Sequence, residues 1–243
     1  VYTQGYGFEN REQQIACSNS TMFRWASVSK PVTAIAAMQL VEQGKLNLTD
    51  DVRSYVPEFP DKEQKITVRD LLCHQSGIVH YSNGPVIRTE ADYKTENPFG
   101  EVILALDTFR ESPLVQPPGE KFSYSTHAYI LLSAVVERAG DEKFADQVAN
   151  RIAKPLGMES LQPDYQWIDI PNRAVGYRAV GSSDPVVSTN TDVSWKLGGG
   201  GFISNVDDFA RFGVALVNGQ MLNKKSYRTM WTPQKISSGE TTE

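Results

Sequence analysis

The chain has 243 residues, enough for one large domain or two closely packed ones. Apolar residues make up 40% and charged residues 22%, as in ordinary globular proteins, and the formal net charge is -5. Because Lys and Arg are scattered and outnumbered by Asp and Glu, the sequence has no electrostatic footprint for nucleic acid. A run of about 18 apolar residues is also missing, so we expect no transmembrane segment.

The first residues, VYTQGYGFEN, alternate aromatic side chains between glycines and predict a sheet strand over residues 2–8. They contain neither the basic nor the apolar segment of a signal peptide, so they do not indicate a compartment. Since the chain opens on a strand without a lead-in, we expect the natural domain to begin before this strand.

Helices are predicted after residue 26, each from apolar residues at helical spacing with a glycine or proline near its end. They cover residues 27–44, 67–77, 126–140, 143–157 and 204–219. Thr67 with Asp70, and Ser204 with Asp207, have the spacing of capping boxes at two of the starts. The stretches 80–120 and 158–200 are rich in Pro, Gly, Asn, Asp and Ser and predict long loops, which often carry function.

One strand cannot form a sheet alone. The pattern of elements therefore leaves two alternatives open: a mostly helical fold, or a mixed fold whose other strands lie outside this chain.

Ser27 and Lys30 form the one Ser-x-x-Lys tetrad of the chain. At helical pitch, residues three apart share a face, so their side chains would meet in the first turn of the helix. A serine hydroxyl becomes a nucleophile when a base removes its proton, and a lysine is such a base when its pKa is lowered. Chance alone places about one such tetrad in a chain of this size, so the tetrad by itself is a weak signal. Its apolar neighbours Trp25, Ala26 and Val28 favour a buried lysine.

Tyr124 is a second candidate, because it lies between the turn at residues 117–119 and an amphipathic helix. There its phenol could reach the Ser-Lys pair and transfer a proton, at about 2.6–3.5 Å from Ser27. The alternative is that Tyr124 is a partly buried aromatic residue and that Ser125 or Thr126 is the N-cap of the helix. For Tyr124 considered alone, the sequence favours this structural interpretation.

The histidines and cysteines do not have the spacing of a metal site, so we expect neither metal nor cofactor. His74 is expected to fix a turn after a helix, His80 to pack a loop or line a cleft, and His127 to lie in a first helical turn. The two cysteines, Cys17 and Cys73, give no disulfide framework, and whether they pair stays open.

The ordered motifs SVSK, LLCHQSGIVHY, PPGEKFSYST and GGGGFISNVDDFARFG resemble the serine beta-lactamase-like superfamily. That superfamily includes class C beta-lactamases, D-Ala-D-Ala carboxypeptidases and related esterases. The likeness covers nearly the whole chain, and YVPEFPDKE and MWTP bring it nearest to the mitochondrial type and its bacterial relatives.

The resemblance implies an α/β (α+β) fold in which helices flank an antiparallel sheet and a mainly helical region adjoins it. It implies one catalytic domain over residues 1–243, with a sheet strand and lead-in over 1–26 and the active-site motifs in a mainly helical region over 27–220.

The resemblance also implies a serine hydrolase that forms an acyl-enzyme with an ester, amide, peptide or beta-lactam substrate and needs no cofactor. Ser27 would be the acylated nucleophile, with its N–H as half of the oxyanion hole, and Lys30 and Tyr124 would transfer protons. Thr126 would contact the substrate, at a position where class C enzymes have Asn. A threonine lacks the paired donor and acceptor of an amide, so we expect ester or peptide hydrolysis to exceed beta-lactam hydrolysis.

The family's third motif, Lys-Thr-Gly or His-x-Gly on a strand, is represented only by residues 196–198, Lys-Leu-Gly. These precede the helix that the family's third motif follows, so we interpret them as a chance match. We therefore expect the true motif and the last strands after Glu243, and a fragment that ends there to be insoluble or inactive. The glycines at 198–201 predict a close approach of the backbone to a substrate or to a neighbouring strand.

Two other classes of protein stay open: a binding or sensing module that keeps the pocket but turns over poorly, and a structural or assembling protein. The presence of Ser27, Lys30 and Tyr124 together favours the hydrolase. The substrate, the compartment and the oligomeric state are not indicated by the sequence.

Overall fold

The computed structural model describes residues 2–89, 91–181 and 183–242. The α-helices are α1 (Ser29–Glu42), α2 (Val68–Leu72), α3 (Thr126–Gly140), α4 (Phe144–Val148), α5 (Leu197–Gly200), α6 (Val206–Val217) and α7 (Lys224–Trp231). The strands are β1 (Phe8–Asn10), β2 (Ile15–Ala16), β3 (Phe23–Arg24), β4 (Gln162–Pro163), β5 (Tyr177–Val180), β6 (Ser183–Val187) and β7 (Phe202–Ser204). Short turns of 3-10 type, and one π-helical turn, η5, lie between them: η1 (Ala26–Val28), η2 (Val52–Ser54), η3 (Pro98–Gly100), η4 (Leu104–Thr108), η5 (Ala149–Ala153), η6 (Lys154–Leu156) and η7 (Ser194–Lys196).

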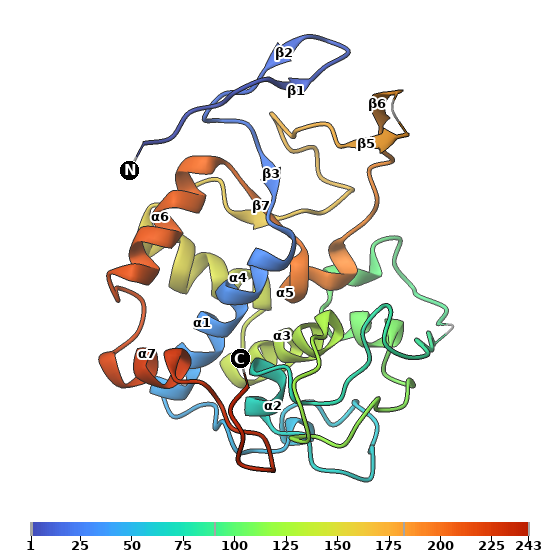
Figure 1. Ribbon diagram of the computed structural model, residues 1–243, viewed down its shortest axis with the longest axis vertical. Helices are drawn as coiled ribbons and strands as arrows, with labels where there is room; N and C mark the ends of the chain where they lie inside the picture. The colour runs from blue at the N-terminus through green and yellow to red at the C-terminus, as the bar shows by residue number, and fades with distance from the viewer. Residues whose placement is uncertain (1, 90, 182, 243) are drawn as a thin grey trace.

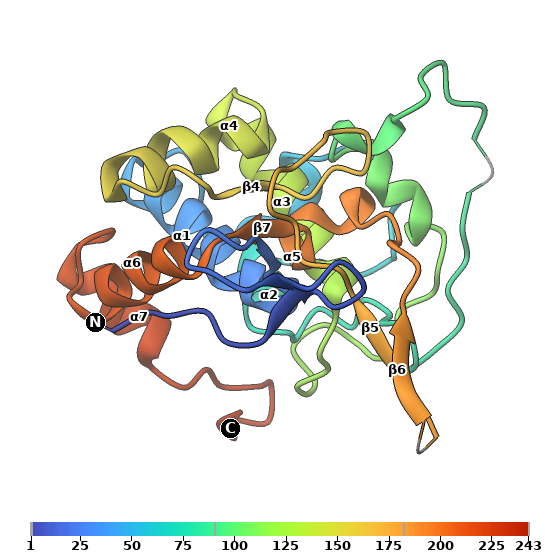
Figure 2. The same ribbon diagram turned by 90° about the horizontal axis from the view of Figure 1, so that it is seen from above.

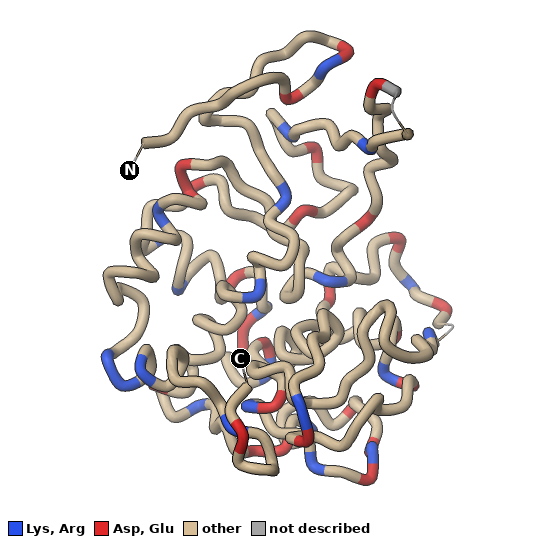
Figure 3. Tube along the Cα trace, in the orientation of Figure 1, with Lys and Arg blue, Asp and Glu red and all other residues tan. Residues whose placement is uncertain are grey.

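Helices form most of the molecule, and the strands gather toward one end (Figure 1). The described residues form three antiparallel groups of strands: the pair β1-β2, the three-stranded sheet β3-β7-β4 and the pair β5-β6. The two pairs stand away from the helices, which Figure 2 shows from above. Lys and Arg are interspersed with Asp and Glu along the chain (Figure 3). Among the described residues, no helix has the length and apolar character needed to cross a membrane.

The core is built around α1 and α3, which pack against each other and against α5. Ten of the 14 residues of α1 and 11 of the 15 residues of α3 are buried. A helix buried on nearly every side needs apolar or small residues all round rather than one apolar stripe. This explains why the runs that form α1 and α3 contain so many alanines, valines and leucines.

Side-chain caps fix where two of the predicted helices begin. Thr67 and Asp70 form the predicted capping box at the start of α2. The hydroxyl of Ser125 accepts a hydrogen bond from the Ala128 N–H at the start of α3, which makes Ser125 its N-cap. The predicted span of α3 is confirmed at both ends.

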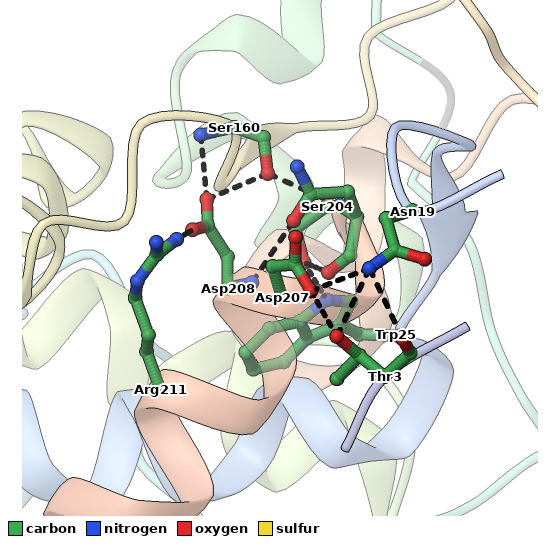
Figure 4. Close-up of polar contacts among 9 residues, drawn as sticks. Thr3, Asn19, Trp25, Ser160, Ser204, Asp207, Asp208 and Arg211 are labelled. Atoms are coloured by element: carbon green, nitrogen blue, oxygen red, sulfur yellow. Dashed lines mark hydrogen bonds and ion pairs between the residues drawn. The ribbon is translucent and has the colours of Figure 1, made fainter. Parts of the chain in front are cut away.

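The predicted cap of α6 is wrong by one residue. Asn205, rather than Ser204, accepts a hydrogen bond from the helix, from the N–H of Asp208 at 2.9 Å. Ser204 is the last residue of β7, and its hydroxyl accepts a hydrogen bond from Trp25 Nε1 at 2.7 Å (Figure 4). Ser204, which the sequence pattern assigned to the helix cap, thus belongs to the sheet.

The polar network at the start of α6 also holds the N-terminal segment. Asp207 accepts hydrogen bonds from Thr3 Oγ1 at 2.5 Å and from Asn19 Nδ2 at 3.2 Å (Figure 4). Together with the hydrogen bond from Trp25 to Ser204, these contacts attach residues that precede η1 to the junction of β7 and α6.

The predicted strand over residues 2–8 is wrong. Strand β1 begins at Phe8 and pairs with β2. Gly7 has a φ of +74°, in the left-handed region that interrupts an extended run. A Cβ on Gly5 would lie 2.5 Å from the carbonyl carbon of Cys17, so this glycine permits the segment to cross close to residue 17. Gly7 therefore interrupts the extended run before β1, and Gly5 permits the close crossing.

The other helices start or end within a few residues of the prediction. The predicted helix over 27–44 begins as α1 only at Ser29, and the one over 67–77 ends at Leu72. The predicted helix over 143–157 divides into α4, the π-helical turn η5 and the 3-10 turn η6. Gly157, with a φ of +64°, ends this helix as predicted.

Candidate active site

Ser27 lies in the turn η1 between β3 and α1, and its side chain is exposed. The turn is anchored to the sheet because the Trp25 N–H donates to the Phe202 carbonyl at 2.9 Å. Ala26 has a φ of +46°, and this left-handed conformation costs a residue with a Cβ about 1–2 kcal/mol. Backbone strain next to an exposed serine is typical of a functional site.

Lys30 extends from the first turn of α1 toward three oxygen atoms. Its Nζ lies 3.1 Å from Ser27 Oγ, 3.3 Å from Thr126 Oγ1 and 2.6 Å from the Gly199 carbonyl oxygen. These partners match the three donors of an ammonium group. Only 5% of the Lys30 surface is exposed. The Gly199 carbonyl, nearly 170 residues after Lys30 in the chain, therefore helps to hold the Lys30 amine beside Ser27.

Burial lowers the pKa of Lys30 below its ordinary value, and the charge of Lys196 lowers it further. Tyr124 opposes this effect without reversing it. The Lys30 ammonium lies 4.8 Å from the centre of the Tyr124 ring. A lowered pKa makes the neutral amine, the form that can accept a proton, easier to reach.

Tyr124 completes the group, with its hydroxyl 2.8 Å from Ser27 Oγ. The predicted convergence of Lys30 and Tyr124 on Ser27 is thereby confirmed as geometry. Burial alone would raise the pKa of Tyr124, but hydrogen bonding and the charge of Lys30, with a further contribution from Ser27, lower it overall. Both partners of Ser27 thus have a pKa shifted toward the form that accepts a proton.

Two histidines hold the Tyr124–Thr126 segment in place, which sequence reasoning missed. His74 Nδ1 accepts a hydrogen bond from the Ser125 N–H, and His80 Nδ1 accepts one from the Thr126 N–H, both at 3.2 Å. The His74 ring also packs on Tyr124, with 4.5 Å between the ring centres. An imidazole that accepts at Nδ1 is neutral, and burial lowers the pKa of His74 to about 4. No local sequence pattern indicates this role, because the hydrogen bonds join residues 51 and 46 positions apart in the chain.

His74 also ends α2, as predicted, since its φ of +56° is incompatible with a continuing helix. His127 lies in the first turn of α3, again as predicted. Its Nδ1 is 2.8 Å from the Val79 carbonyl, and its ring stacks on Phe109 at 4.7 Å. Burial lowers the pKa of His127 to about 4.

The glycines at 198–201 bring α5 against α3, so the close approach was predicted but its partner was not. A Cβ on Gly199 would lie 2.6 Å from Thr126 Cγ2, and one on Gly198 would lie 2.6 Å from Ser133 Cβ. Such distances are shorter than any side chain tolerates. Because glycine has no side chain, α5 can approach α3 closely enough for the Gly199 carbonyl oxygen to accept a hydrogen bond from Lys30.

Residues 196–198 lie in η7 and α5 and not on a strand, which agrees with their rejection as the third motif. Burial lowers the pKa of Lys196, and the charge of Arg24 adds to the effect. Lys196 also lies over the Trp195 ring, 5.6 Å from its centre.

Thr126 is only 3% exposed, and its hydroxyl faces Lys30. In this arrangement it helps to hold the amine. Its contact with a substrate stays a prediction.

Cys17 and Cys73 are not paired with each other. Burial raises the pKa of the Cys73 thiol to about 11, so it is a poor nucleophile at neutral pH. Across residues 2–89, 91–181 and 183–242, no three His, Cys, Asp or Glu side chains form a group that could hold a metal ion.

Comparison of the sequence with known proteins identifies the family. The Beta-lactamase family profile matches residues 1–241. The chain is 31% identical to the serine beta-lactamase-like protein LACTB, mitochondrial, of Mus musculus, over 92% of this chain and 53% of that protein. It is 30% identical to the putative penicillin-binding protein PbpX of Bacillus subtilis (strain 168), over 98% of this chain and 57% of that protein. The chain thus spans about half the length of the curated relatives it matches.

Several solved structures have a similar fold. A penicillin-binding protein from Bacillus halodurans matches with a TM-score of 0.77 and 26% identity, over 94% of this chain and 69% of that chain. The octameric penicillin-binding protein homologue from Pyrococcus abyssi has a TM-score of 0.76 and 26% identity, over 96% of this chain and 53% of that chain. EstCE1, a hydrolase with promiscuous acyltransferase activity, shares the fold at 24% identity and a TM-score of 0.77, over 93% of this chain and 67% of that chain. These likenesses confirm the predicted α+β fold of beta-lactamase/transpeptidase type, and the chain belongs to the Beta-lactamase family.

Proposed function

We propose that this protein is a serine hydrolase that cleaves an ester, amide, peptide or beta-lactam bond through an acyl-enzyme on Ser27. The observation that carries the proposal is the convergence of Lys30 Nζ and Tyr124 Oη on Ser27 Oγ, at 3.1 and 2.8 Å. Membership of the Beta-lactamase family supports it. So do the lowered pKa values of both Lys30 and Tyr124, since acid–base catalysis needs groups that exchange protons near neutral pH.

The first step requires one of these two groups to lose a proton. While Lys30 is an ammonium and Tyr124 a phenol, both donate to Ser27 Oγ and neither acts as a base that takes up its proton. Once either is deprotonated, it takes the Ser27 hydroxyl proton as Oγ bonds to the substrate carbonyl carbon. The proton then passes to the leaving group as its bond to that carbon breaks, and an acyl-enzyme remains.

The second step releases the acid. A water molecule gives a proton to the Lys30–Tyr124 pair and attacks the acyl carbon, and the bond from that carbon to Ser27 Oγ breaks. The proton returns to Oγ, which restores the starting state. The Ser27 N–H, at the strained turn before α1, is assigned as one donor to the oxyanion in both steps.

A covalent probe tests this proposal. The protein is incubated with a fluorophosphonate or a penicillin, and the modified residue is mapped by mass spectrometry. We expect one adduct, on Ser27, that is lost in Ser27→Ala and kept in Ser123→Ala, which removes a hydroxyl from the residue before Tyr124. Labelling that survives Ser27→Ala would rule out Ser27 as the nucleophile.

Turnover separates the hydrolase from a binding module of the same fold. A hydrolase releases p-nitrophenol from p-nitrophenyl esters over many cycles, whereas a binding module stops after one equivalent. Substrate preference is tested with the same esters, a chromogenic cephalosporin and D-Ala-D-Ala peptides. We expect the cephalosporin to be the poorer substrate, and Thr126→Asn to raise its turnover if residue 126 contacts the substrate. Faster cleavage of the cephalosporin than of any ester would contradict this expectation.

A further inference from the structure

A cavity of about 250 Å³ lies between α1, α2, α3, α6 and α7, and none of Ser27, Lys30 and Tyr124 lines it. Figure 1 shows α7 and the segment that follows it beside α1 and α2. The walls are formed mainly by apolar side chains, including Ala34 and Met38 of α1, Leu72 of α2, Tyr129 of α3, and Met230 and Trp231 of α7. Such a mainly apolar lining favours an apolar body over water, because water needs several polar partners and few of these walls offer one.

The cavity has one charged residue in its lining, Arg69 of α2. Arg69 NH1 donates to Gln234 Oε1 at 2.7 Å, and in the part of the chain that the structure describes Arg69 has no ion-pair partner. The neighbouring carboxylate of Asp70 is engaged in the capping box, where it accepts from the N–H and hydroxyl of Thr67. A guanidinium has five N–H donors, so Arg69 keeps donors for a further acceptor.

We propose that this cavity binds a small monocarboxylate with an apolar body, such as an aryl-substituted short-chain acid. Arginine pairs with carboxylates through two parallel hydrogen bonds, which selects this anion over a neutral or cationic group. An apolar cavity of about 150 Å³ is known to hold benzene. The larger space here can therefore hold a benzene ring together with a short chain that reaches Arg69.

The cavity borders the elements that hold the candidate active site. Tyr129 lines it, and the centre of the Tyr129 ring is 5.7 Å from Lys30 Nζ. The Tyr129 hydroxyl donates to the Leu72 carbonyl at 2.9 Å, just before α2 leads into His74. The binding site nevertheless stands on its own contacts and does not depend on the proposed hydrolase activity.

Methionine methyl groups report on the cavity directly. Met38 and Met230 line it, whereas Met22 and Met158 are buried elsewhere and serve as internal controls. The protein is labelled with ¹³C-methyl methionine and titrated with 3-phenylpropanoate. We expect saturable chemical-shift changes at Met38 and Met230 and unchanged signals from Met22 and Met158. Equal changes at all four, or none at Met38 and Met230, would overturn the site.

Two variants and one neutral probe test the ligand class. We expect 3-phenylpropan-1-ol, which has the same apolar body without the charge, to bind about tenfold more weakly than the acid, a difference of about 1.4 kcal/mol. Arg69→Gln should remove that preference, and Ala34→Met, which fills the cavity, should abolish binding of both probes. The Met22 and Met158 signals show whether each variant is folded. If acid and alcohol bind equally well to the unchanged protein, or Arg69→Gln keeps the preference, the carboxylate assignment is wrong.

Discussion

The centre of the molecule and its two hairpins are held together in different ways. Around Lys30, the contacts join η1, α3 and α5, which are far apart in the sequence. The hairpins β1-β2 and β5-β6 pair segments that are neighbours in the sequence, and they leave Phe8 54% and Val187 50% exposed. Two-stranded hairpins with exposed apolar residues contribute little stability by themselves. The positions of the candidate catalytic groups therefore depend on helix packing.

The difference teaches where substitutions should matter. In the centre, atoms are so close that a single added methyl group collides with a neighbouring helix, as at Gly199. In the hairpins, a glycine such as Gly181 has open space around its Cβ position and serves only the turn, with a φ of +58°. We expect effects on activity and stability to be large in the first region and small in the second.

The largest expected effect comes from Lys30, which is buried beside Ser27, whereas Lys196 nearby is half-buried. Lys30→Met should lower kcat by roughly 10³–10⁴-fold, because it removes a base that contacts Ser27 Oγ. Lys196→Met is the matched control, since burial lowers the pKa of Lys196 as well but no hydrogen bond joins it to Ser27 among the described residues. Steady-state kinetics with a p-nitrophenyl ester measure both. An equal loss in Lys196→Met would bring residues 196–198 back as the third motif.

The second largest effect is expected from a substitution at Gly199, where α5 packs closely against α3. Gly199→Ala should destabilise the fold by about 1–3 kcal/mol, because its Cβ would lie 2.6 Å from Thr126 Cγ2. It should also lower kcat, since the Gly199 carbonyl that holds Lys30 must move. Urea unfolding and kinetics measure the two consequences.

Gly213→Ala in α6 is the control for this substitution. Nothing lies within 4 Å of its Cβ position, so we expect a gain of about 0.5–1 kcal/mol from the better helix former. A Gly199→Ala protein as stable as Gly213→Ala would mean that α5 does not pack on α3 as closely as the structure has it.

The contrast between the regions also explains what could be predicted from the sequence. The tetrad at Ser27, Tyr124 before a helix and an N-cap at Ser125 or Thr126 are local patterns that residue order and spacing bring to attention, and the family resemblance then favours a catalytic role for Ser27 and Tyr124. The same holds for α3, whose apolar run has a capping residue at one end and a glycine at the other.

What could not be predicted depends on contacts between distant segments. Strand β3 has two residues and exists only because β7 lies beside it, about 180 residues later in the chain. The partner of Gly199 and the hydrogen bonds from the Tyr124–Thr126 segment to His74 and His80 are likewise set by packing. The wrong strand over residues 2–8 has the same origin, since alternating aromatics do not reveal that Gly5 passes Cys17.

Acidification should lower the free energy of unfolding through two histidines in the helical centre, His74 and His127. Burial lowers the pKa of His74 and His127 to about 4, so between pH 4 and their ordinary value of 6.5 the unfolded chain binds protons that the folded chain does not. Stability therefore rises with pH across this window and falls as the solution is acidified. At pH 5 the loss relative to neutral pH is about 2 kcal/mol for each histidine.

Urea unfolding at pH 7 and pH 5 measures this loss. His127→Phe, which keeps a ring stacked on Phe109, should remove about half of it. If the free energy of unfolding of His127→Phe fell between pH 7 and pH 5 by as much as that of the unchanged protein, His127 would have to be protonated in the folded state at pH 5.

The smallest effect is expected in a hairpin, and it tests the difference between the hairpins and the helical centre directly, because the same change, Val→Thr, can be made in both. Val187→Thr lies in β6, where the side chain is 50% exposed, so we expect the free energy of unfolding to change by less than about 0.5 kcal/mol. Val135→Thr lies in α3, where the side chain is fully buried. There the new hydroxyl loses water, and we expect a cost of about 1–3 kcal/mol. If Val187→Thr were as costly as Val135→Thr, the β5-β6 hairpin would have to be part of the cooperative core, and the helices alone would not account for the position of the site.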